Sequence, residues 1–233
     1  MKSLLNRLLS ALEPVDRDRL VPHFQEQALE RGRVLYAAGA PITHVYFLHS
    51  GIISLEVASS EGALVESATI GNEGAIGVGG LLAGDTSFTH QVVELPGRAS
   101  VIDRRPFLEL VQESATLRKL LWSYADYFAS HVLQMAACNA LHDAEERLAR
   151  GLLHLADRWD QPELPVTQEV LSKMLGVRRS TVTLAAHVMQ TAGLISYRRG
   201  RLAILDKSGL AELSCECYRV ISNLQSRLLT KTN

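Results

Sequence analysis

A single glycine between two short amphipathic segments constrains this chain more than any other feature. The segment TQEVLSKM begins at Thr167 with a helix-capping residue, and RRSTVTLAAHVMQ, from Arg178, repeats the helical period. Gly176 allows a tight turn between them, and Gly193 ends the second segment. The positions expected to point inward are Val170, Leu171, Met174, Val182, Ala185, Ala186 and Met189. Two short helices about a glycine turn form a helix-turn-helix.

The following residues add a basic hairpin. In LISYRRGRLAILD, two strand-like runs flank a tip, Tyr197–Arg201, that carries three arginines. Residues 164–207 hold seven basic and two acidic residues, a net charge of +5, whereas the whole chain carries −1 and the remainder therefore −6. A basic module on an acidic body favours a polyanionic partner at one end. We therefore predict a winged helix-turn-helix that binds double-stranded DNA.

The second helix presents the residue types that contact DNA. Arginine reaches guanine or phosphate, whereas hydroxyl groups and helix N-terminal amides hold phosphates. Leu184 could touch a thymine methyl group, and the hairpin arginines would contact the backbone of any sequence. The expected contacts are Thr167, Gln168, Arg178, Arg179, Ser180, Thr181, Thr183, Leu184, His187, Arg198, Arg199 and Arg201. The alternative is a helical hairpin with a solvated charged face, but glycine turn, basic charge and hairpin coincide here.

The first half of the chain has a different character. After an N-terminal helix, residues 30–112 contain short β-rich runs such as HVYFLHS and GIISLEV, separated by frequent glycines. This spacing predicts a small antiparallel barrel or roll.

A helical stripe follows the β-rich region. Apolar and aromatic residues recur at alternating spacings of three and four for more than three heptads, which is typical of a coiled-coil seam. The seam residues are Leu117, Leu121, Tyr124, Phe128, His131, Met135 and Cys138, with His142 next in register. We expect a dimer along this stripe, with a helix packed on its own domain as the alternative. His131 and His142 on the seam suggest the hypothesis of pH-sensitive dimerisation.

These patterns divide the chain into three parts. DAEE, from Asp143, has the spacing of a capping box and starts a new helix. We assign residues 1–113 to an effector-sensing domain with an N-terminal helix, 114–142 to a dimerisation helix and 143–233 to the DNA-binding domain. The predicted fold class is α+β.

The whole chain resembles the Crp/Fnr superfamily, the cyclic-AMP-receptor-like transcription regulators. RLARGLLHLADRW and the segment LPVTQEVLSKMLGVRRSTVTLAAHVMQTAGLISYRRGRLAIL look like the family's DNA-binding region. RGRVLYAAGAPITHVYFLHSGIISLEV, residues 31–57, is similar to the opening strands of its cyclic-nucleotide-binding-like β-roll. The resemblance implies a homodimer on a near-palindromic site, with RNA polymerase as a further partner and an effector in the roll.

The resemblance also implies roles for single residues. Arg179 occupies the position of the family's guanine-reading arginine, and Thr181 that of its phosphate-binding threonine. Ser180 and Leu184 stand where the cyclic-AMP receptor has a base-reading glutamate and a second base-reading arginine. The operator of that receptor is therefore not expected here.

Two cofactor classes of the family are not expected. Its cyclic-nucleotide binders use a glycine-glutamate pair and, about ten residues later, arginine followed by serine or threonine, which hold ribose and phosphate. Here these pocket positions fall on Gly77, Val78, Phe88 and Thr89, so both charged partners are missing. An iron-sulfur cluster of the kind resembling Fnr needs cysteines near the N-terminus, whereas the first cysteine is Cys138.

No metal site is evident in the sequence. Cys215 and Cys217 form a C-x-C pair, but a metal would need further ligands and no histidine lies near them in the sequence. Cys138 is expected to be a small buried residue, with oxidation across a dimer as the alternative. The histidines lack ligand spacing, which leaves haem ligation by His44, His49 or His90 as a minor alternative.

The sequence features fit three functional classes to different degrees. We favour a sequence-specific transcription regulator that responds to an unidentified effector or acts without one. A ligand-sensing signalling module whose C-terminal domain contacts a protein is the alternative, but the basic hairpin argues against it. An enzyme is not expected, because no nucleophile–base arrangement, phosphate loop or paired acids occur in a recognisable context. No apolar run approaches a membrane span, so we expect a cytoplasmic protein with no membrane partner.

Overall fold

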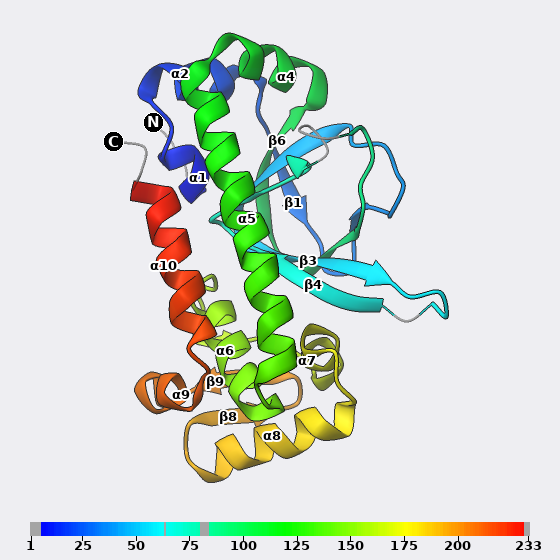
Figure 1. Ribbon diagram of the computed structural model, residues 1–233, viewed down its shortest axis with the longest axis vertical. Coiled ribbons are helices and arrows are strands. Elements are labelled where there is room, and N and C mark those ends of the chain that lie inside the picture. Colours follow the sequence, from blue (N-terminus) through cyan, green and yellow to red (C-terminus); the bar gives the residue numbers. More distant parts are fainter. Residues whose placement is uncertain (1–5, 63, 80–83, 231–233) are drawn as a thin grey trace.

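The computed structural model describes residues 6–62, 64–79 and 84–230. A sheet-rich body with short helices at one end lies above a smaller helical module, and one long helix, α5, runs beside the body down to the module (Figure 1). The predicted α+β class is confirmed, with the roll, long helix and C-terminal helix-turn-helix in the expected order.

The body consists of an antiparallel roll with a cap of short helices at one end. The cap comprises α1 (Arg7–Ser10), α2 (Pro14–Leu20) and the 3-10 helix η1 (Val21–His23). The strands are β1 (Gln25–Leu29), β2 (Val34–Tyr36), β3 (His44–Ala58), β4 (Leu64–Ile70), β5 (Ala75–Ile76) and β6 (His90–Asp103). They pair in the order β1-β6-β3-β4, with β2 on β6 and β5 on β3.

One long strand replaces the two short runs suggested by the sequence. HVYFLHS and GIISLEV are both part of β3, and Gly51 lies inside it with a φ of 86°. The register between β3 and β6 shifts on both sides of Gly51. A Cβ atom added at Gly97, in β6, would lie 2.1 Å from the Ser50 carbonyl oxygen. Gly51 and Gly97 therefore allow β3 and β6 to approach closely at a bulge, and they do not form a turn.

Helical capping defines the middle of the chain. Helix α4 (Arg104–Glu113) is followed by Ser114, whose hydroxyl group accepts a hydrogen bond from Leu117 N at 3.0 Å and caps α5 (Ala115–Leu141). Asp143 forms the predicted capping box at the start of α6 (Ala144–Ala156). These caps fix the starts of α5 and α6, and only His142 and Asp143 lie between the end of α5 and the start of α6.

The lower module is built around a continuous apolar core. It comprises α6, β7 (Glu163–Leu164), α7 (Gln168–Leu175), α8 (Arg179–Thr191), β8 (Ile195–Arg198), β9 (Arg201–Ile204) and α9 (Lys207–Leu213). The three strands pair in the order β7-β9-β8. The predicted inward positions of α8 are buried, and so is Leu171 of α7, whereas Val170 and Met174 are partly buried against the core.

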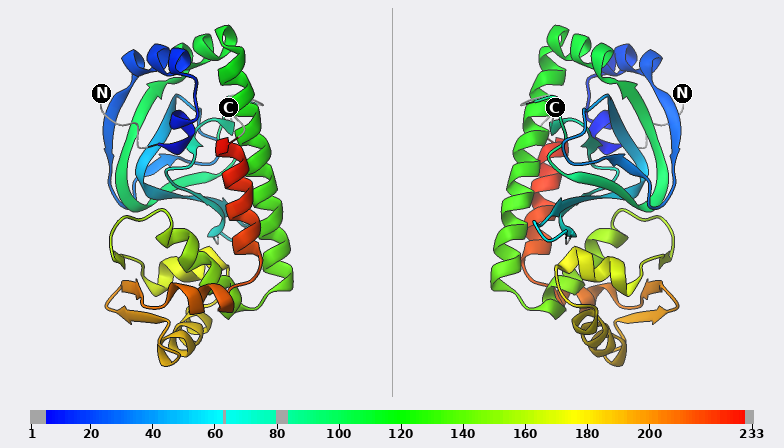
Figure 2. Two further views of the ribbon diagram at one scale, coloured as in Figure 1. Left: turned by 90° about the vertical axis from the view of Figure 1, so that its left-hand side faces the viewer. Right: turned by 90° about the vertical axis from the view of Figure 1, so that its right-hand side faces the viewer.

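The last helix leaves this module. Helix α10 (Cys217–Thr230) turns back and packs along α5 towards the roll (Figures 1 and 2). Its Leu228 is buried in the cluster that holds Leu8, Phe47 and Phe107 of the roll and its helical cap. The final segment of the range 143–233 is thus attached to the body.

The predicted dimer seam does not face a partner. Leu117, Leu121, Tyr124, His131, Met135 and Cys138 are buried within the chain, and Phe128 is partly buried. They pack against the roll, the helical cap and α10, so the alternative reading of this stripe, as a helix packed on its own domain, is correct. The pKa of His131 is lowered to about 3, chiefly by burial and also by the charges of Arg158 and Arg150. His131 therefore stays neutral near neutral pH and cannot make dimerisation pH-sensitive.

Among the helices of the described residues, none has both the length and the apolar character to cross a membrane.

Candidate nucleic-acid interface

The helix-turn-helix has the local geometry that its sequence predicts. The Thr167 hydroxyl group accepts a hydrogen bond from Val170 N at 3.3 Å and caps α7. Gly176 ends α7 in the left-handed conformation, with φ 62° and ψ 34°. Arg178 then caps α8 with an extended backbone. A residue with a Cβ atom would be strained at Gly176, so glycine is suited to the turn between α7 and α8.

One face of α8 is polar and open to solvent. Arg179, Ser180, Thr183 and His187 are exposed, as is the apolar Leu184, which is 64% exposed. The opposite face carries Val182, Ala185, Ala186 and Met189 and is buried. Since the inward face is fully used by the module's own core, the outward face is free to contact a ligand.

The start of α7 supports the start of α8. Arg179 donates from Nε to Gln168 Oε1 at 3.2 Å, so the two helices are joined by a side-chain hydrogen bond beside the turn. Thr183 donates its hydroxyl hydrogen to the Arg179 carbonyl oxygen at 3.0 Å. The guanidinium group of Arg179 keeps its other N–H donors, which form the fork that reads guanine or holds phosphate.

The predicted hairpin is present and its tip is tight. Strands β8 and β9 pair Arg198 with Arg201, leaving Arg199 and Gly200 as a two-residue turn. Both turn residues have positive φ values, 50° and 75°, which is the pattern of a type I′ turn. A Cβ atom on Gly200 would lie 3.5 Å from Thr167 Cγ2, so the hairpin tip is next to the start of α7.

Most of the predicted contact residues therefore share one surface. The described structure leaves Arg178, Arg179, Ser180, Thr183, Leu184, His187, Arg198, Arg199 and Arg201 exposed, and Thr167, Gln168 and Thr181 partly exposed. Arg201 differs from the other arginines of the hairpin, because Glu163 of β7 accepts from its Nη1 at 3.2 Å. A phosphate at Arg201 would have to compete with this carboxylate.

The predicted effector positions differ in their burial. Val78 is buried in the apolar cluster that contains Phe47, whereas Phe88 is 83% exposed. Gly77 has a φ of 89°, and a Cβ atom there would lie 2.5 Å from the His44 carbonyl oxygen. Arg98, the nearest arginine later in the roll, pairs at 2.7 Å with Glu26 on the surface. Among the described residues, these positions provide no buried carboxylate and arginine for ribose and phosphate.

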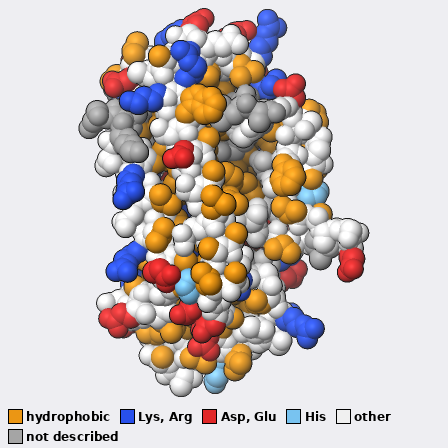
Figure 3. All heavy atoms as spheres, in the orientation of Figure 1, with side chains coloured by type: hydrophobic (Ala, Val, Ile, Leu, Met, Phe, Trp, Pro, Cys, Tyr) orange, Lys and Arg blue, Asp and Glu red, His pale blue; other side chains and the backbone are white. Residues whose placement is uncertain are grey.

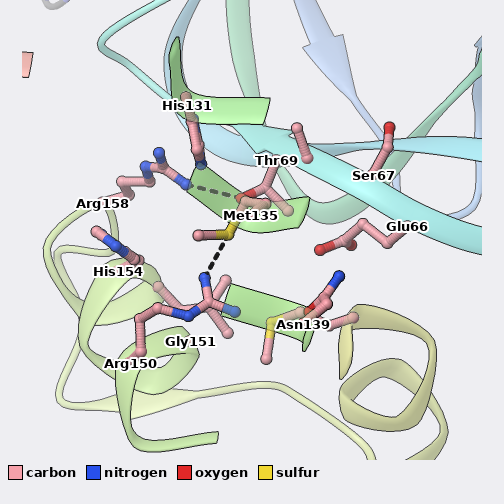
Figure 4. A pocket seen from close by; sticks show the side chains of 13 residues that line it. Glu66, Ser67, Thr69, His131, Met135, Asn139, Arg150, Gly151, His154 and Arg158 are labelled. Carbon is pink, nitrogen blue, oxygen red and sulfur yellow. Dashed lines mark hydrogen bonds between the residues drawn. The ribbon is translucent and has the colours of Figure 1, made fainter. Parts of the chain in front are cut away.

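A polar pocket lies at the junction of body and module, and it was not predicted from the sequence. In Figure 4, Arg150 and His154 of α6, and Arg158 just beyond the end of that helix, face β4 and the lower half of α5. Arg158 donates to Thr69 Oγ1 at 2.8 Å and forms a buried ion pair with Glu73 at 2.7 Å. Burial lowers the pKa of His154, with the charges of Arg158 and Arg150 adding to the shift.

The junction pocket joins the roll to the helix-turn-helix module. A buried ion pair is costly to break, because either partner alone would be an uncompensated charge. Its one signal in the sequence is a row of basic residues on the apolar helix ERLARGLLHLADR, which a solvated face explains equally well.

Two models of known protein domains match separate parts of this chain. A model of the cyclic nucleotide-binding domain matches residues 26–114, and a model of the Crp-like helix-turn-helix domain matches residues 146–213. The Global nitrogen regulator of Synechococcus elongatus is 24% identical over an alignment of 220 residues, and the match covers 89% of this chain and 96% of that protein.

Solved structures share the fold at low sequence identity. FixK2 from Bradyrhizobium japonicum has a TM-score of 0.72 and 16% identity, covering 82% of this chain and 98% of its own. A transcriptional regulator of the CRP/FNR family from Thermus thermophilus has a TM-score of 0.65 and 21% identity, with 82% and 98% covered.

Proposed function

Because the chain belongs to the Crp/Fnr superfamily of DNA-binding transcription regulators, we propose that it acts as a homodimer on a near-palindromic site in double-stranded DNA. Each protomer would place the exposed face of α8 in the major groove and the hairpin on the neighbouring backbone. Regulation of transcription then implies RNA polymerase as a further partner.

The observation that carries this proposal is the continuous surface of α8, the start of α7 and the hairpin. Arg179 is oriented by Gln168 at the N-terminal end of α8, the end that meets base edges in helix-turn-helix proteins. Arg198 and Arg199 stand beside it without an ion-pair partner among the described residues. Their charge supplies the sequence-independent part of the affinity, and Arg179 the sequence-dependent part.

A second stripe on α5 supports the dimer. It comprises Trp122, Asp126, Ala129, Leu133, Ala136 and Ala140, which are all exposed and alternate in spacings of four and three. Trp122 and Leu133 are 62% and 71% exposed, and hydrophobic side chains run down the molecule over α5 in Figure 3. Alanines at three of the six positions let a second helix approach closely. We propose that a second copy of the chain covers this stripe.

Two-fold symmetry then determines the form of the DNA site. Two copies of α8 related by a two-fold axis read inverted half-sites about one helical turn apart, roughly 34 Å. The base preferences are expected to differ from those of the cyclic-AMP receptor, because Ser180 and Leu184 replace its charged base-reading residues.

We further propose that the roll does not bind cyclic nucleotides through the family's contacts. Val78 lacks the carboxylate that holds ribose, and Phe88 lacks the guanidinium group that neutralises the cyclic phosphate. Calorimetric titration with cyclic AMP and cyclic GMP is expected to give no heat of binding. An effector of another class, or activity without one, remains compatible with the DNA-binding surface.

Selection of binding sites from random duplex DNA tests the function directly. Purified protein without added effector is expected to enrich an inverted repeat. If folded dimer enriches no sequence either alone or with added cell metabolites, the C-terminal module contacts another partner and the proposal fails. A protein-contacting signalling module would also lack the steep decrease of DNA affinity with salt that phosphate contacts produce.

A hairpin variant tests the phosphate contacts separately. Arg199→Ala is expected to weaken binding to all sequences evenly and to make the salt slope shallower by about one unit per half-site. Arg105→Ala provides a matched control, because Arg105 is an exposed arginine on α4 in the body. An unchanged slope in Arg199→Ala would remove this residue from the interface.

A further inference from the structure

Three cysteines and a histidine meet where α5 ends and α10 begins. Cys138 lies in the last turn of α5, and His142 caps that helix. Cys215 lies in the short link between α9 and α10, and Cys217 is the first residue of α10. All three cysteines are buried, and one potential ligand atom from each of the four residues lies within 4.8 Å of the others.

The separations match those around one tetrahedral ion. Cys138 Sγ and Cys215 Sγ are 3.5 Å apart, and Cys217 Sγ is 3.7 Å from His142 Nδ1. With Zn–S bonds near 2.3 Å, two sulfur ligands of a tetrahedral zinc ion lie about 3.8 Å apart. The sulfur atoms of a disulfide would be about 2.0 Å apart. The four atoms thus surround a volume suited to one ion.

His142 is oriented as a ligand. Its Nε2 lies 3.2 Å from Glu216 Oε2, so Nε2 carries the hydrogen and donates to the carboxylate. This tautomer leaves the lone pair of Nδ1 directed at the sulfur atoms. A carboxylate on the far nitrogen is the usual outer partner of a zinc-bound histidine, because it fixes the ring and raises its basicity.

Two further groups suit thiolate ligands. Gln134 donates from Nε2 to Cys217 Sγ at 3.0 Å. Arg150 lies near the cluster, because it donates from Nη1 to Met135 Sδ, three residues before Cys138 in α5, at 2.7 Å. Three thiolates and one divalent ion carry a net charge of −1, which this arginine partly compensates. A cluster of cysteines acting only as small apolar residues would need none of these polar partners.

We propose that Cys138, His142, Cys215 and Cys217 bind one zinc ion. The set Cys₃His is typical of closed structural zinc sites, in which the protein supplies all four ligands. Binding displaces the remaining thiol protons to solvent and leaves the oxidation state of zinc unchanged. The ion joins the start of α10 to the junction of α5 and α6, and therefore fixes the DNA-facing module against the body. This inference is independent of the proposed DNA site.

The sequence shows Cys215 and Cys217 as a C-x-C pair but does not show their partners. No histidine lies near them along the chain, whereas His142 lies next to Cys217 in space. The spacing Cys138-x₃-His142 does place two ligands on one side of a helix end, and this was the available signal.

Metal content of the intact chain tests the site. Protein purified under reducing conditions, without a metal-affinity tag, is expected to contain about one zinc ion per chain by plasma emission. After removal of zinc, titration with Co²⁺ is expected to give the intense near-ultraviolet bands of thiolate ligation and the visible bands of tetrahedral cobalt. A chelator should lower the Tm of the wild type, because the ion binds only the folded arrangement.

Two variants make the test specific to the four ligands. His142→Gln and Cys217→Ser should lose most of the bound zinc and become insensitive to chelator, whereas His23→Gln, at an exposed histidine outside the cluster, should behave like the wild type. If a ligand variant fails to fold, the cobalt spectrum of the wild type decides. Folded, reduced wild type that binds neither Zn²⁺ nor Co²⁺ overturns the proposal. A Cys138–Cys215 disulfide without metal uptake would identify a redox pair instead, and bound sulfide with iron would identify a cluster.

Discussion

Helices α5 and α8 use apolar side chains in different ways. Helix α8 has one apolar stripe, which the module's core buries, and a polar face that remains open. Helix α5 has two stripes with the same heptad spacing. One is buried in its own chain, and the other, with Trp122 and Leu133, is exposed.

The difference shows what periodicity can and cannot reveal. A single stripe assigns both faces of a helix at once, because the core takes the apolar face and leaves the other to solvent or ligand. In a helix with two apolar stripes, the size of the side chains indicates which stripe is buried in the chain's own core. The stripe of α5 with larger side chains, such as Leu121 and Tyr124, is buried within the chain. The alanine-rich stripe is exposed, and we propose that another copy binds there.

The largest expected effect is at the buried stripe of α5. Leu121→Glu places a carboxylate in a fully packed apolar cluster and should cost roughly 4 kcal/mol or more of unfolding free energy. Thermal denaturation is expected to show a large decrease in Tm or no folded protein. A stably folded variant that simply dissociates would restore the first assignment of the seam.

The exposed stripe should respond differently. Leu133→Glu is expected to keep its Tm but to become monomeric in sedimentation experiments, because the charge lies at the proposed contact between copies. Loss of two-site attachment should then weaken operator binding by ~100-fold or more. Val15→Glu, at another exposed apolar residue, is the control. A Leu133→Glu protein that stays dimeric would show that the stripe is not the interface.

Helix α8 provides the next test. Arg179→Ala should reduce affinity for the selected site by about 1–3 kcal/mol and relax the preference at one base pair of each half-site. Binding to the selected site and to its single-base variants, measured at constant salt, checks both effects. An unchanged preference would place Arg179 on phosphate.

The last test concerns the pH dependence of stability at the junction pocket. Glu66 lines the junction pocket, and burial raises its pKa to about 8, partly offset by a hydrogen bond from Ser54. Since its pKa in the unfolded chain is near 4.5, the folded state binds the proton more tightly. Its contribution to stability is complete below about pH 4.5 and decreases as the pH rises to about 8. Glu66→Gln, which cannot ionise, should show a smaller Tm difference between acidic and alkaline buffer than the wild type.

An exposed acid gives the matched control for this measurement. Glu61→Gln lies in the turn before β4 and should keep the wild-type dependence of Tm on pH. Equal Tm differences in the wild type and Glu66→Gln would show that the Glu66 carboxyl group titrates normally.

Local chemistry explains which features were predictable. The cap at Thr167, the turn at Gly176 and the capping box at Asp143 each depend on residues within four positions, and all three are present. The long-range features were not predictable. Gly51 has the composition of a turn, yet pairing with β6 makes it a bulge, and the packing of α10 on α5 brings Cys215 to Cys138.

The return of α10 to the body has a consequence for the order in which the protein is completed during synthesis. The roll and α5 leave the ribosome first, yet their shared apolar cluster includes Leu228, near the C-terminus. The winged module lies between them in the chain and finds almost all of its core within residues 148–213. The part made first is therefore finished last, and the apolar surface that Leu228 covers must stay soluble until α10 has been synthesised.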